Sequence, residues 1–234
     1  MWNVKCKNMN IKEIEILNGH SVIREGENVC LIDTGNPITI HTDNSLLFCG
    51  RRFDTVTQGM GGITSASLSA MAGFHFTTLL GADILRNYAV RFDYKAGVAA
   101  FSENGDISTD GFDSLPVTFS IGNVPVIENT IAGRRAKVVF DTGAKLSYLD
   151  ASFFAGIESI GTESDFYPVL GNFETAVYRL NSTFGQRTIA VRYGNLPSEI
   201  QLLPAFGVNG IVGFDFLNNF EIVLDYHNGM LFVK

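Results

Sequence analysis

Two carboxylates stand in identical short motifs in this 234-residue chain, Asp33-Thr34-Gly35 and Asp141-Thr142-Gly143. Each motif follows a run of apolar residues, so each Asp is expected where a buried strand ends in a tight turn. Two carboxyl groups held close together cannot both ionise, and they share one proton over a broad pH range. The ionised group can then take a proton from water while the protonated group donates one to a carbonyl oxygen. The repeated motif therefore predicts general acid–base chemistry at a paired-carboxyl site.

A longer stretch of the sequence is also repeated. Residues 79–94 align without a gap to residues 211–226. Internal repeats define the architecture of a chain, and these two copies predict two lobes of about 110 residues. The polar, turn-rich run 102–113 lies between the copies and predicts the boundary between the lobes. We therefore expect an N-terminal lobe over residues 1–110 and a C-terminal lobe over residues 111–234.

The two lobes are expected to differ in length. Gly81 follows Asp33 by 48 residues, whereas Gly213 follows Asp141 by 72 residues. The second lobe therefore carries about 24 extra residues, which we expect to form an added strand and loop within residues 178–207. Such an extension predicts that the two lobes contribute unequally to a substrate groove.

These paired elements resemble the aspartic peptidases, and the resemblance covers nearly all of the chain. In that family each lobe contributes one Asp-Thr-Gly loop and a later strand with two apolar residues and a Gly, which Leu79-Leu80-Gly81 and Ile211-Val212-Gly213 match. The lobes resemble retropepsin-like members in length and are fused in one chain as in pepsin-like members. The resemblance implies an all-β, bilobal aspartic-protease-like fold with a few short helices. It also implies two closed-barrel-like lobes related by a pseudo-two-fold axis.

The resemblance also implies a role for each residue of the two motifs. Asp33 and Asp141 correspond to the catalytic pair of an aspartic endopeptidase. In the family the two threonines hydrogen-bond the backbone of the opposite lobe, and the two glycines let the carboxyl groups converge. The residues expected to support the catalytic loops are Thr34, Gly35, Asn36, Thr142, Gly143 and Ala144.

The residues that follow the two motifs depart from the pepsin-like pattern. Pepsin-like enzymes usually place Ser or Thr there, whereas this chain has Asn36-Pro37 in one lobe and Ala144 in the other. Ala144 lacks a hydroxyl donor that would favour the ionised carboxylate, although the Asn36 amide could still donate. Pro37 stiffens its turn. We therefore expect the dyad to titrate at higher pH than that of pepsin, with an optimum between mildly acidic and neutral pH.

A glycine-rich segment begins about 26 residues beyond Asp33. Glycines between two β-prone arms predict a mobile hairpin, and the segment resembles the flap of retroviral proteases. A flexible surface loop is the alternative. The residues expected in this flap and in substrate binding are Gly59, Met60, Gly61, Gly62 and Ile63. The corresponding stretch of the second lobe, residues 167–173, is stiffer and more aromatic, so we expect a flap in the first lobe only. Candidate groove residues that would favour apolar substrate side chains are Met60, Ile63, Phe166, Tyr167 and Phe173.

Other catalytic plans have less support. The four histidines show no metal-ligand spacing and the three cysteines form no CxxC pair, so no metal or other cofactor is expected. Cys30 is expected to be a buried core residue. A Cys–His nucleophile pair is a weaker alternative to the paired aspartates. The aspartates that recur in the longer repeat are expected to cap helices or to form hydrogen bonds within each lobe, and they are Asp83, Asp93, Asp215 and Asp225.

The composition limits the partners. Hydrophobic residues make up 46% of the chain and charged residues 18%, which favours a folded protein. The net charge of −7 argues against nucleic acid or an anionic membrane as the main partner. Neither an apolar signal segment nor a membrane-spanning run is expected, and an odd number of cysteines disfavours a disulfide framework. We expect a cytoplasmic monomer that acts on peptide or protein substrates. The alternative is a non-catalytic peptide-binding or regulatory protein on the same fold.

Overall fold

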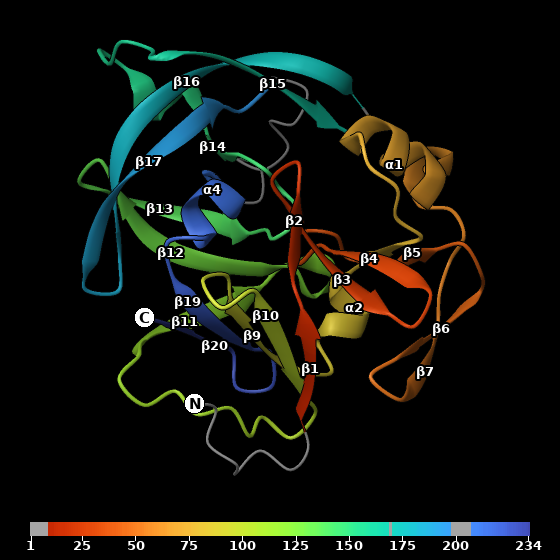
Figure 1. Cartoon of the computed structure of the whole chain (residues 1–234). Coiled ribbons are helices and arrows are strands. Elements are labelled where there is room, and N and C mark those ends of the chain that lie inside the picture. The colour runs from red at the N-terminus through yellow and green to blue at the C-terminus, as the bar shows by residue number, and fades with distance from the viewer. Residues whose placement is uncertain (1–8, 169, 198–206) are drawn as a thin grey trace.

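The computed structural model of the chain describes residues 9–168, 170–197 and 207–234, which form a mainly β structure (Figure 1). In chain order, the elements up to Ser102 are β1 (Met9–Glu13), β2 (Glu15–Leu17), β3 (His20–Glu25), β4 (Asn28–Ile32), β5 (Ile40–His41), β6 (Ser45–Phe48), β7 (Arg51–Asp54), the 3-10 helix η1 (Met60–Gly62), α1 (Ser65–Ala72), β8 (Thr78–Leu80), α2 (Ala82–Leu85), β9 (Ala89–Asp93) and β10 (Val98–Ser102). Those that follow are β11 (Asp113–Phe119), η2 (Ile121–Asn123), β12 (Pro125–Ile131), β13 (Arg134–Phe140), β14 (Ser147–Leu149), η3 (Ala151–Phe154), β15 (Gly161–Tyr167), β16 (Gly171–Phe184), β17 (Arg187–Asn195), β18 (Gly210–Val212), α4 (Phe214–Leu217), β19 (Glu221–Asp225) and β20 (Met230–Val233).

A sheet shared by the two halves of the chain joins them. Its strands run in the order β1-β10-β9-β19-β20-β11, three from each half. The central strands β9 and β19 are antiparallel, and Arg91 pairs with Val223. These two residues stand ten positions after Gly81 and Gly213, so they are equivalent in the sequence repeat. The sheet is therefore centred on a pair of equivalent residues, as a pseudo-two-fold axis requires.

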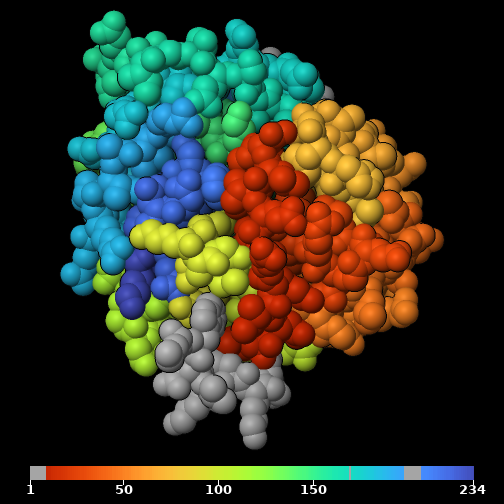
Figure 2. Space-filling model, in the orientation of Figure 1, coloured from red at the N-terminus to blue at the C-terminus, as the bar shows by residue number. Residues whose placement is uncertain are grey.

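Each half also builds its own lobe on a pair of parallel strands. In the first lobe β4 runs parallel to β8 within a sheet of order β2-β3-β4-β8-β5. In the second lobe β13 runs parallel to β18. There the strands β12-β13-β18-β14-β17-β16 form a closed barrel, because β16 also pairs with β12. Figure 2 shows the first lobe, in red to yellow, beside the second lobe, in green to blue. The expected fold class, mainly β with two lobes and a few short helices, is confirmed.

The largest hydrophobic core continues across both lobes. It contains fully buried side chains from the strands that lead to the two aspartates, such as Ile32 and Phe140. It also contains Phe92 and Leu224 from the shared sheet. The apolar runs before the aspartates are thus interior strands, which is why each carboxyl group emerges at the point where a strand leaves the core.

The length difference between the lobes appears as three antiparallel strands, β15, β16 and β17. Strand β16 has 14 residues and pairs along its length with β15 and β17. The added strand expected within residues 178–207 lies in the β16–β17 pair, while residues 198–206 of that range lie outside the described residues. Residues 103–112 form turns and irregular chain between β10 and β11, and the lobe boundary at residue 110 stays a prediction.

The predicted first-lobe hairpin flap is wrong in its shape. Gly59–Ile63 form a tight loop with a 3-10 turn, closed by the Gly59 N–H donating to the Ile63 carbonyl at 2.7 Å. The second expected arm is helical instead, because the Thr64 side chain and Ser67 form a capping box that begins α1. Gly61 and Gly62 have φ values of 73° and 78°, so their turn leads into this helix rather than into a second strand.

The repeated aspartates make hydrogen bonds within their lobes, as expected. Asp83 accepts a 2.6 Å bond from the Thr39 hydroxyl, and Asp215 accepts a 2.8 Å bond from the equivalent Ser147 hydroxyl. The same two hydroxyl oxygens accept the N–H groups of Gly81 and Gly213. Asp93 and Asp225 accept N–H groups within the turns that follow their strands. These four carboxylates therefore hold the strand ends in place.

Asp215 makes stability depend on pH. Burial raises its pKa to about 6. Because this carboxyl is easier to protonate in the folded chain than in the unfolded chain, the free energy of unfolding should fall by about 2 to 3 kcal/mol as the pH rises from about 4 to about 6. Asp215→Asn is expected to remove this contribution. Denaturant unfolding of both proteins from pH 4 to 7 tests it, and a stability difference that stays constant with pH would contradict it.

Candidate active site

The ends of the paired parallel strands place Asp33 and Asp141. The Asp33 N–H donates to the Leu80 carbonyl at 2.9 Å, and the Asp141 N–H donates to the Val212 carbonyl at 3.0 Å. Each aspartate thus continues the ladder of its lobe by one residue before the chain turns. The two loops meet at the centre of the molecule, and the side chains of the two lobes face each other there.

Gly81, the glycine of the first apolar strand, lets that lobe close around its loop. A Cβ atom on it would lie 2.5 Å from the Ile38 carbonyl carbon. The residue after it, Ala82, donates its N–H to the Asn36 carbonyl at 2.8 Å. In the second lobe a Cβ on Gly213 would lie 2.6 Å from the Ala144 carbonyl oxygen. Only a residue without a side chain fits this close backbone approach, which explains the repeated apolar-apolar-Gly pattern.

The two threonines tie the loops together through buried hydrogen bonds. The Thr34 N–H donates to Thr142 Oγ1 at 3.1 Å, and the Thr142 N–H donates to Thr34 Oγ1 at 3.0 Å. Each hydroxyl in turn donates to the opposite lobe, Thr34 to the Phe140 carbonyl at 2.6 Å and Thr142 to the Ile32 carbonyl at 2.8 Å. These four reciprocal bonds fix the distance and orientation of one loop relative to the other.

Each carboxyl group packs against the glycine of the opposite loop. A Cβ on Gly35 would lie 2.3 Å from the Asp141 carboxyl carbon, and a Cβ on Gly143 would lie 2.4 Å from the Asp33 carboxyl carbon. The space that a side chain would occupy at either glycine is therefore filled by a carboxyl group from the other lobe. This crossing brings the two carboxyl groups into hydrogen-bonding contact with each other.

The two carboxyl groups are not equivalent. Burial raises the pKa of Asp33 well above its ordinary value, and the neighbouring charge of Asp141 raises it further. Burial also raises the pKa of Asp141, but the Gly143 N–H, at 2.8 Å from Oδ1, opposes this effect. The pKa of each carboxyl group is thus raised, and two carboxyl groups this close hold one proton between them.

Comparison with known proteins shows which fold the chain has. No protein-family model matches the chain, and no curated protein matches it. Among solved structures, the aspartic proteinase from Irpex lacteus is similar to the chain, with 13% sequence identity, a TM-score of 0.54 and 96% of each chain covered. The chain has the fold of the aspartic proteinases. A retropepsin-like aspartic protease from Rickettsia conorii is also similar, with 12% identity, a TM-score of 0.38 and coverage of 52% of this chain and 90% of that chain.

In this aspartic-proteinase fold, the residues after the motifs act through their backbones. The Asn36 N–H donates to Asp33 Oδ1 at 2.9 Å, and the Ala144 N–H donates to Asp141 Oδ1 at 3.2 Å. The expected role of the Asn36 side-chain amide is therefore filled by its N–H group. Pro37 packs against η2, where a Cβ on Gly122 would lie 2.2 Å from the Pro37 Cβ.

The carboxyl groups line a cavity of about 330 Å³ between the lobes. All five candidate groove residues line it. Its walls are mostly apolar, and the further apolar side chains that form them include Leu31, Ile38, Ile40, Leu68, Phe76 and Leu79 from the first lobe and Tyr148, Leu196 and Ile211 from the second. A second hollow of about 730 Å³ adjoins the cavity and shares His20, Lys145, Asp165, Phe166 and Phe173 with it. We call the two together the substrate groove.

The glycine-rich loop reaches the cavity with some of its residues. Gly59, Met60 and Ile63 line the cavity, and Met60 is 83% exposed. Gly61 and Gly62 are not among the lining residues. This loop and α1, which follows it, form the wall of the groove on the side of the first lobe.

A β-hairpin reaches the cavity from the second lobe, and the expectation that only the first lobe carries a flap is wrong. Strands β15 and β16 form this hairpin, whose end lies close to α1 (Figure 1). Tyr167 and Pro168 at its end line the cavity with both carboxyl groups. Burial raises the pKa of the Tyr167 phenol, and the charges of Asp141 and Asp33 raise it further. Tyr167, Pro168 and Phe173 therefore have the position expected of the glycine-rich segment.

His20 is a site residue that the sequence does not indicate. Its side chain is buried, and Nδ1–H donates to the Gly143 carbonyl at 2.8 Å, so a first-lobe strand supports the second aspartate loop. Burial lowers the pKa of His20, which favours the neutral ring. Tyr148 and Asp165 form a 2.5 Å hydrogen bond in the opposite wall. Nothing in the spacing of these residues distinguishes them from structural ones.

The described part of the chain contains neither a metal-binding cluster nor a helix that could span a membrane. Residues 9–168, 170–197 and 207–234 contain no cluster of three His, Cys, Asp or Glu side chains able to hold a metal ion. Within the same ranges, no helix has the length and apolar character needed to cross a bilayer. Cys30 is buried and Cys49 partly buried, both as free thiols, and Cys6 lies outside the described residues.

Proposed function

We propose that the chain is an aspartic endopeptidase that hydrolyses peptide bonds with water. The observation that carries the proposal is the crossing of two partly buried carboxyl groups, each against the glycine of the opposite loop, at a distance where they must share one proton. Water placed between such groups is activated without a metal or a covalent intermediate. The reciprocal threonine bonds support the same conclusion, because general acid–base catalysis requires groups held in a fixed geometry.

In the proposed reaction Asp33 starts protonated and Asp141 starts ionised. Asp141 removes a proton from water, and the hydroxyl oxygen forms a bond to the carbonyl carbon of the scissile amide. Asp33 gives its proton to the carbonyl oxygen, which produces a neutral gem-diol. Asp141 then returns its proton to the leaving nitrogen as the C–N bond breaks. One gem-diol hydroxyl returns a proton to Asp33, which restores the starting state of the pair.

The shape of the groove supports a peptide or protein substrate. The cavity at the carboxyl groups and the adjoining hollow, with volumes of about 330 and 730 Å³, together offer room for several residues of a peptide. Their apolar walls favour apolar side chains on both sides of the scissile bond. One chain supplies both carboxyl groups, which agrees with action as a monomer. We also propose that the protein acts in the cytoplasm.

Cleavage of a mixed peptide library tests the proposal. Wild type should cut peptides between apolar residues, and a peptide in which a hydroxyl-bearing tetrahedral carbon replaces the scissile carbonyl should inhibit strongly as a transition-state analogue. The alternative is a non-catalytic peptide-binding protein, which Asn36-Pro37 and the aromatic stretch at 167–173 favour. Binding of library peptides without cleavage between pH 3 and 8 would support that alternative.

The pH dependence of cleavage follows from the raised pKa of both carboxyl groups. The active pair has one proton, so raising both pKa values moves the active window to higher pH. We expect a maximum of kcat/KM between mildly acidic and neutral pH, with a decline on each side as the pair gains or loses a proton. A pH–rate profile measures this. A maximum below about pH 3, where the pepsin dyad operates, would contradict the prediction.

Tyr167 is expected to contribute to substrate binding and turnover. Its phenol lies near both carboxyl groups at the end of the β15–β16 hairpin. A hydrogen bond from a phenol to a charged or polarised group contributes about 1.5 to 3 kcal/mol, so Tyr167→Phe should lower kcat/KM roughly 10- to 100-fold. Tyr178→Phe is the matched control, because the Tyr178 ring stacks on Phe154 in the same lobe. Equal activity of the two variants would exclude a role for the Tyr167 hydroxyl.

A further inference from the structure

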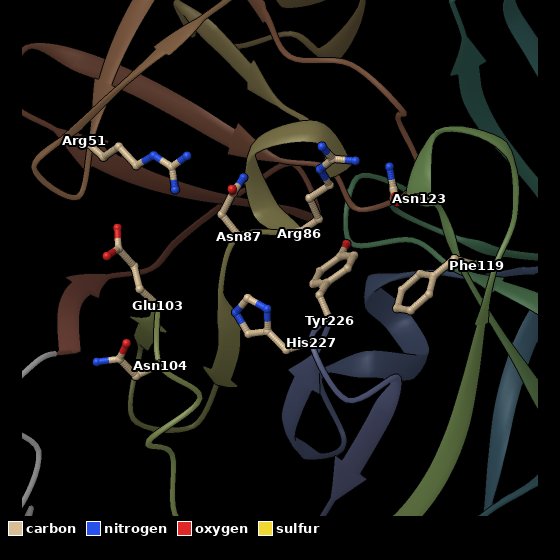
Figure 3. Close-up of a pocket in the computed structure, with 9 residues that line it drawn as sticks. All are labelled: Arg51, Arg86, Asn87, Glu103, Asn104, Phe119, Asn123, Tyr226 and His227. Carbon is tan, nitrogen blue, oxygen red and sulfur yellow. The ribbon is translucent and has the colours of Figure 1, made fainter.

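A second polar pocket lies outside the substrate groove. Its volume is about 510 Å³, and it shares no lining residue with the cavity and hollow around the carboxyl groups. It lies where α2, η2 and the turn after β19 come together, with the start of β7 and the chain after β10 at its other side (Figure 3). We call it the arginine pocket, after Arg51 and Arg86 in its lining.

The charge of the arginine pocket is mainly positive. Arg51 and Arg86 are both exposed, and neither forms an ion pair with any residue that the structure describes. Arg51 lies over the Phe53 ring, which supports its guanidinium without neutralising it. Glu103 supplies the only carboxylate among the lining residues. Two guanidinium groups with donors still available suit a phosphate or carboxylate group, which they bind with two parallel hydrogen bonds each.

Tyr226 adds a buried hydroxyl that lacks a partner. Its side chain is 8% exposed, and its hydroxyl forms no hydrogen bond with the described residues. Figure 3 shows this hydroxyl pointing toward the side of the pocket where Arg86 and Asn123 lie. A buried hydroxyl without a partner costs free energy, and a group that enters the pocket and accepts a hydrogen bond from it would remove this cost.

The sequence repeat shows why this hydroxyl is left unpaired. Tyr226 is equivalent to Tyr94, whose hydroxyl receives a 3.4 Å hydrogen bond from Ser21. Ser21 precedes Val22, which pairs with Leu31, and Leu31 lies two residues before Asp33. In the second lobe Val126 pairs with Val139, which lies two residues before Asp141, so Pro125 is equivalent to Ser21. Pro125 offers Tyr226 neither a hydroxyl nor an N–H group.

The repeat also shows that the two lobes differ in the side chains that lie beside this tyrosine. The Tyr94 ring is covered edge-on by Phe214 at 5.4 Å. The residue equivalent to Phe214 is Ala82, which has no ring to cover Tyr226. Instead, the Tyr226 ring stacks on Phe119 at 5.4 Å, and Phe119 forms an aromatic wall of the pocket. The position beside Tyr94 is thus filled by a ring from the opposite lobe, whereas no equivalent ring covers Tyr226.

We propose that the arginine pocket binds a small organic anion, whose phosphate or carboxylate group pairs with Arg51 and Arg86 and accepts a hydrogen bond from Tyr226. The volume is that of a small-molecule site rather than of a site for a lone ion. The stacked Phe119 and Tyr226 rings provide an apolar surface for a planar part of the ligand. The proposal does not depend on peptidase activity, because the pocket and the substrate groove share no residue.

Titration of the full chain with matched aromatic probes tests the proposal. Calorimetry or NMR with phenyl phosphate, benzoate and phenol compares the same ring with a phosphate, a carboxylate and no anion, and inorganic phosphate is the anion without a ring. Saturable binding of phenyl phosphate or benzoate, with weaker binding of phenol and inorganic phosphate, is expected. The tighter of the two aromatic anions identifies the preferred group. Failure of every anion to saturate at about 10 mM, or equal binding of phenol, would overturn the proposal.

Substitutions locate the binding. Arg51→Gln and Arg86→Gln should each weaken anion binding roughly tenfold, whereas Arg52→Gln, one residue from Arg51 and outside the pocket, should not change it. Tyr226→Phe should weaken it several-fold without loss of folding, and Tyr94→Phe is its matched control in the other lobe. Anion affinity that is unchanged by both arginine substitutions would place the binding elsewhere and overturn the proposal.

Discussion

Asp33→Asn and Asp141→Asn are each expected to lower the rate of peptide hydrolysis about 1,000-fold or more. Asn has nearly the shape of Asp but can neither take a proton from water nor donate one as an acid. General acid–base catalysis by a positioned group typically contributes 10²- to 10⁴-fold, and here the two groups act as one unit. Loss of either member should therefore cost nearly as much as loss of both. Initial rates on a library-derived peptide, for both single variants and the double variant, measure this.

Stability distinguishes lost chemistry from lost folding in these variants. The pKa of each carboxyl group is raised in the folded chain, so ionisation of the pair destabilises the fold as the pH rises. Each Asn variant should then be at least as stable as wild type at neutral pH. Asp93→Asn is the matched control, because Asp93 accepts a turn N–H far from the pair, and it should retain activity. Hydrolysis that survives either dyad substitution would refute the proposed mechanism.

The parts of the site that the sequence predicts are those that local patterns determine. An apolar run that ends in Asp-Thr-Gly places a carboxyl group at the end of a buried strand, and both aspartates lie there. The gap-free repeat predicts that equivalent residues lie across a two-fold axis, and Arg91 pairs with Val223 as that requires. Convergence of the two loops then follows, because one axis relates both motifs. How strongly each carboxyl group ionises depends on N–H groups that no pattern specifies.

The flap shows where local patterns are insufficient. Glycines between β-prone residues favour a hairpin, but Thr64 and Ser67 begin a helix and leave the segment only one extended arm. The hairpin that does reach the carboxyl groups comes from the other lobe, because β16 pairs with both β15 and β17. Pairing between strands is decided by contacts distant in sequence, so composition could indicate the aromatic stretch 167–173 but not its place over the site. The place of His20 beside the second aspartate loop likewise depends on a contact distant in sequence.

The threonine hydroxyls are expected to matter as much for stability as for activity. Thr34→Val and Thr142→Val preserve shape but remove an oxygen that accepts one buried N–H and donates to one buried carbonyl of the opposite lobe. Each buried backbone group left without a partner costs about 1 to 3 kcal/mol, so each variant should lose about 2 to 5 kcal/mol of the free energy of unfolding. Denaturant unfolding measures this loss.

Three further variants separate the contribution of the network from that of side-chain shape. Thr183→Val is the matched surface control, because Thr183 bonds the exposed Thr188 side chain and should change stability little. Thr34→Ser keeps the hydroxyl and should retain most of the stability and activity. The double Val variant should lose less than the sum of the two singles, because either substitution already breaks the one bond between the two hydroxyls. Additive losses would mean that the two hydroxyls act independently, and a loss below about 1 kcal/mol in each single variant would mean that the loops are held by the shared sheet instead.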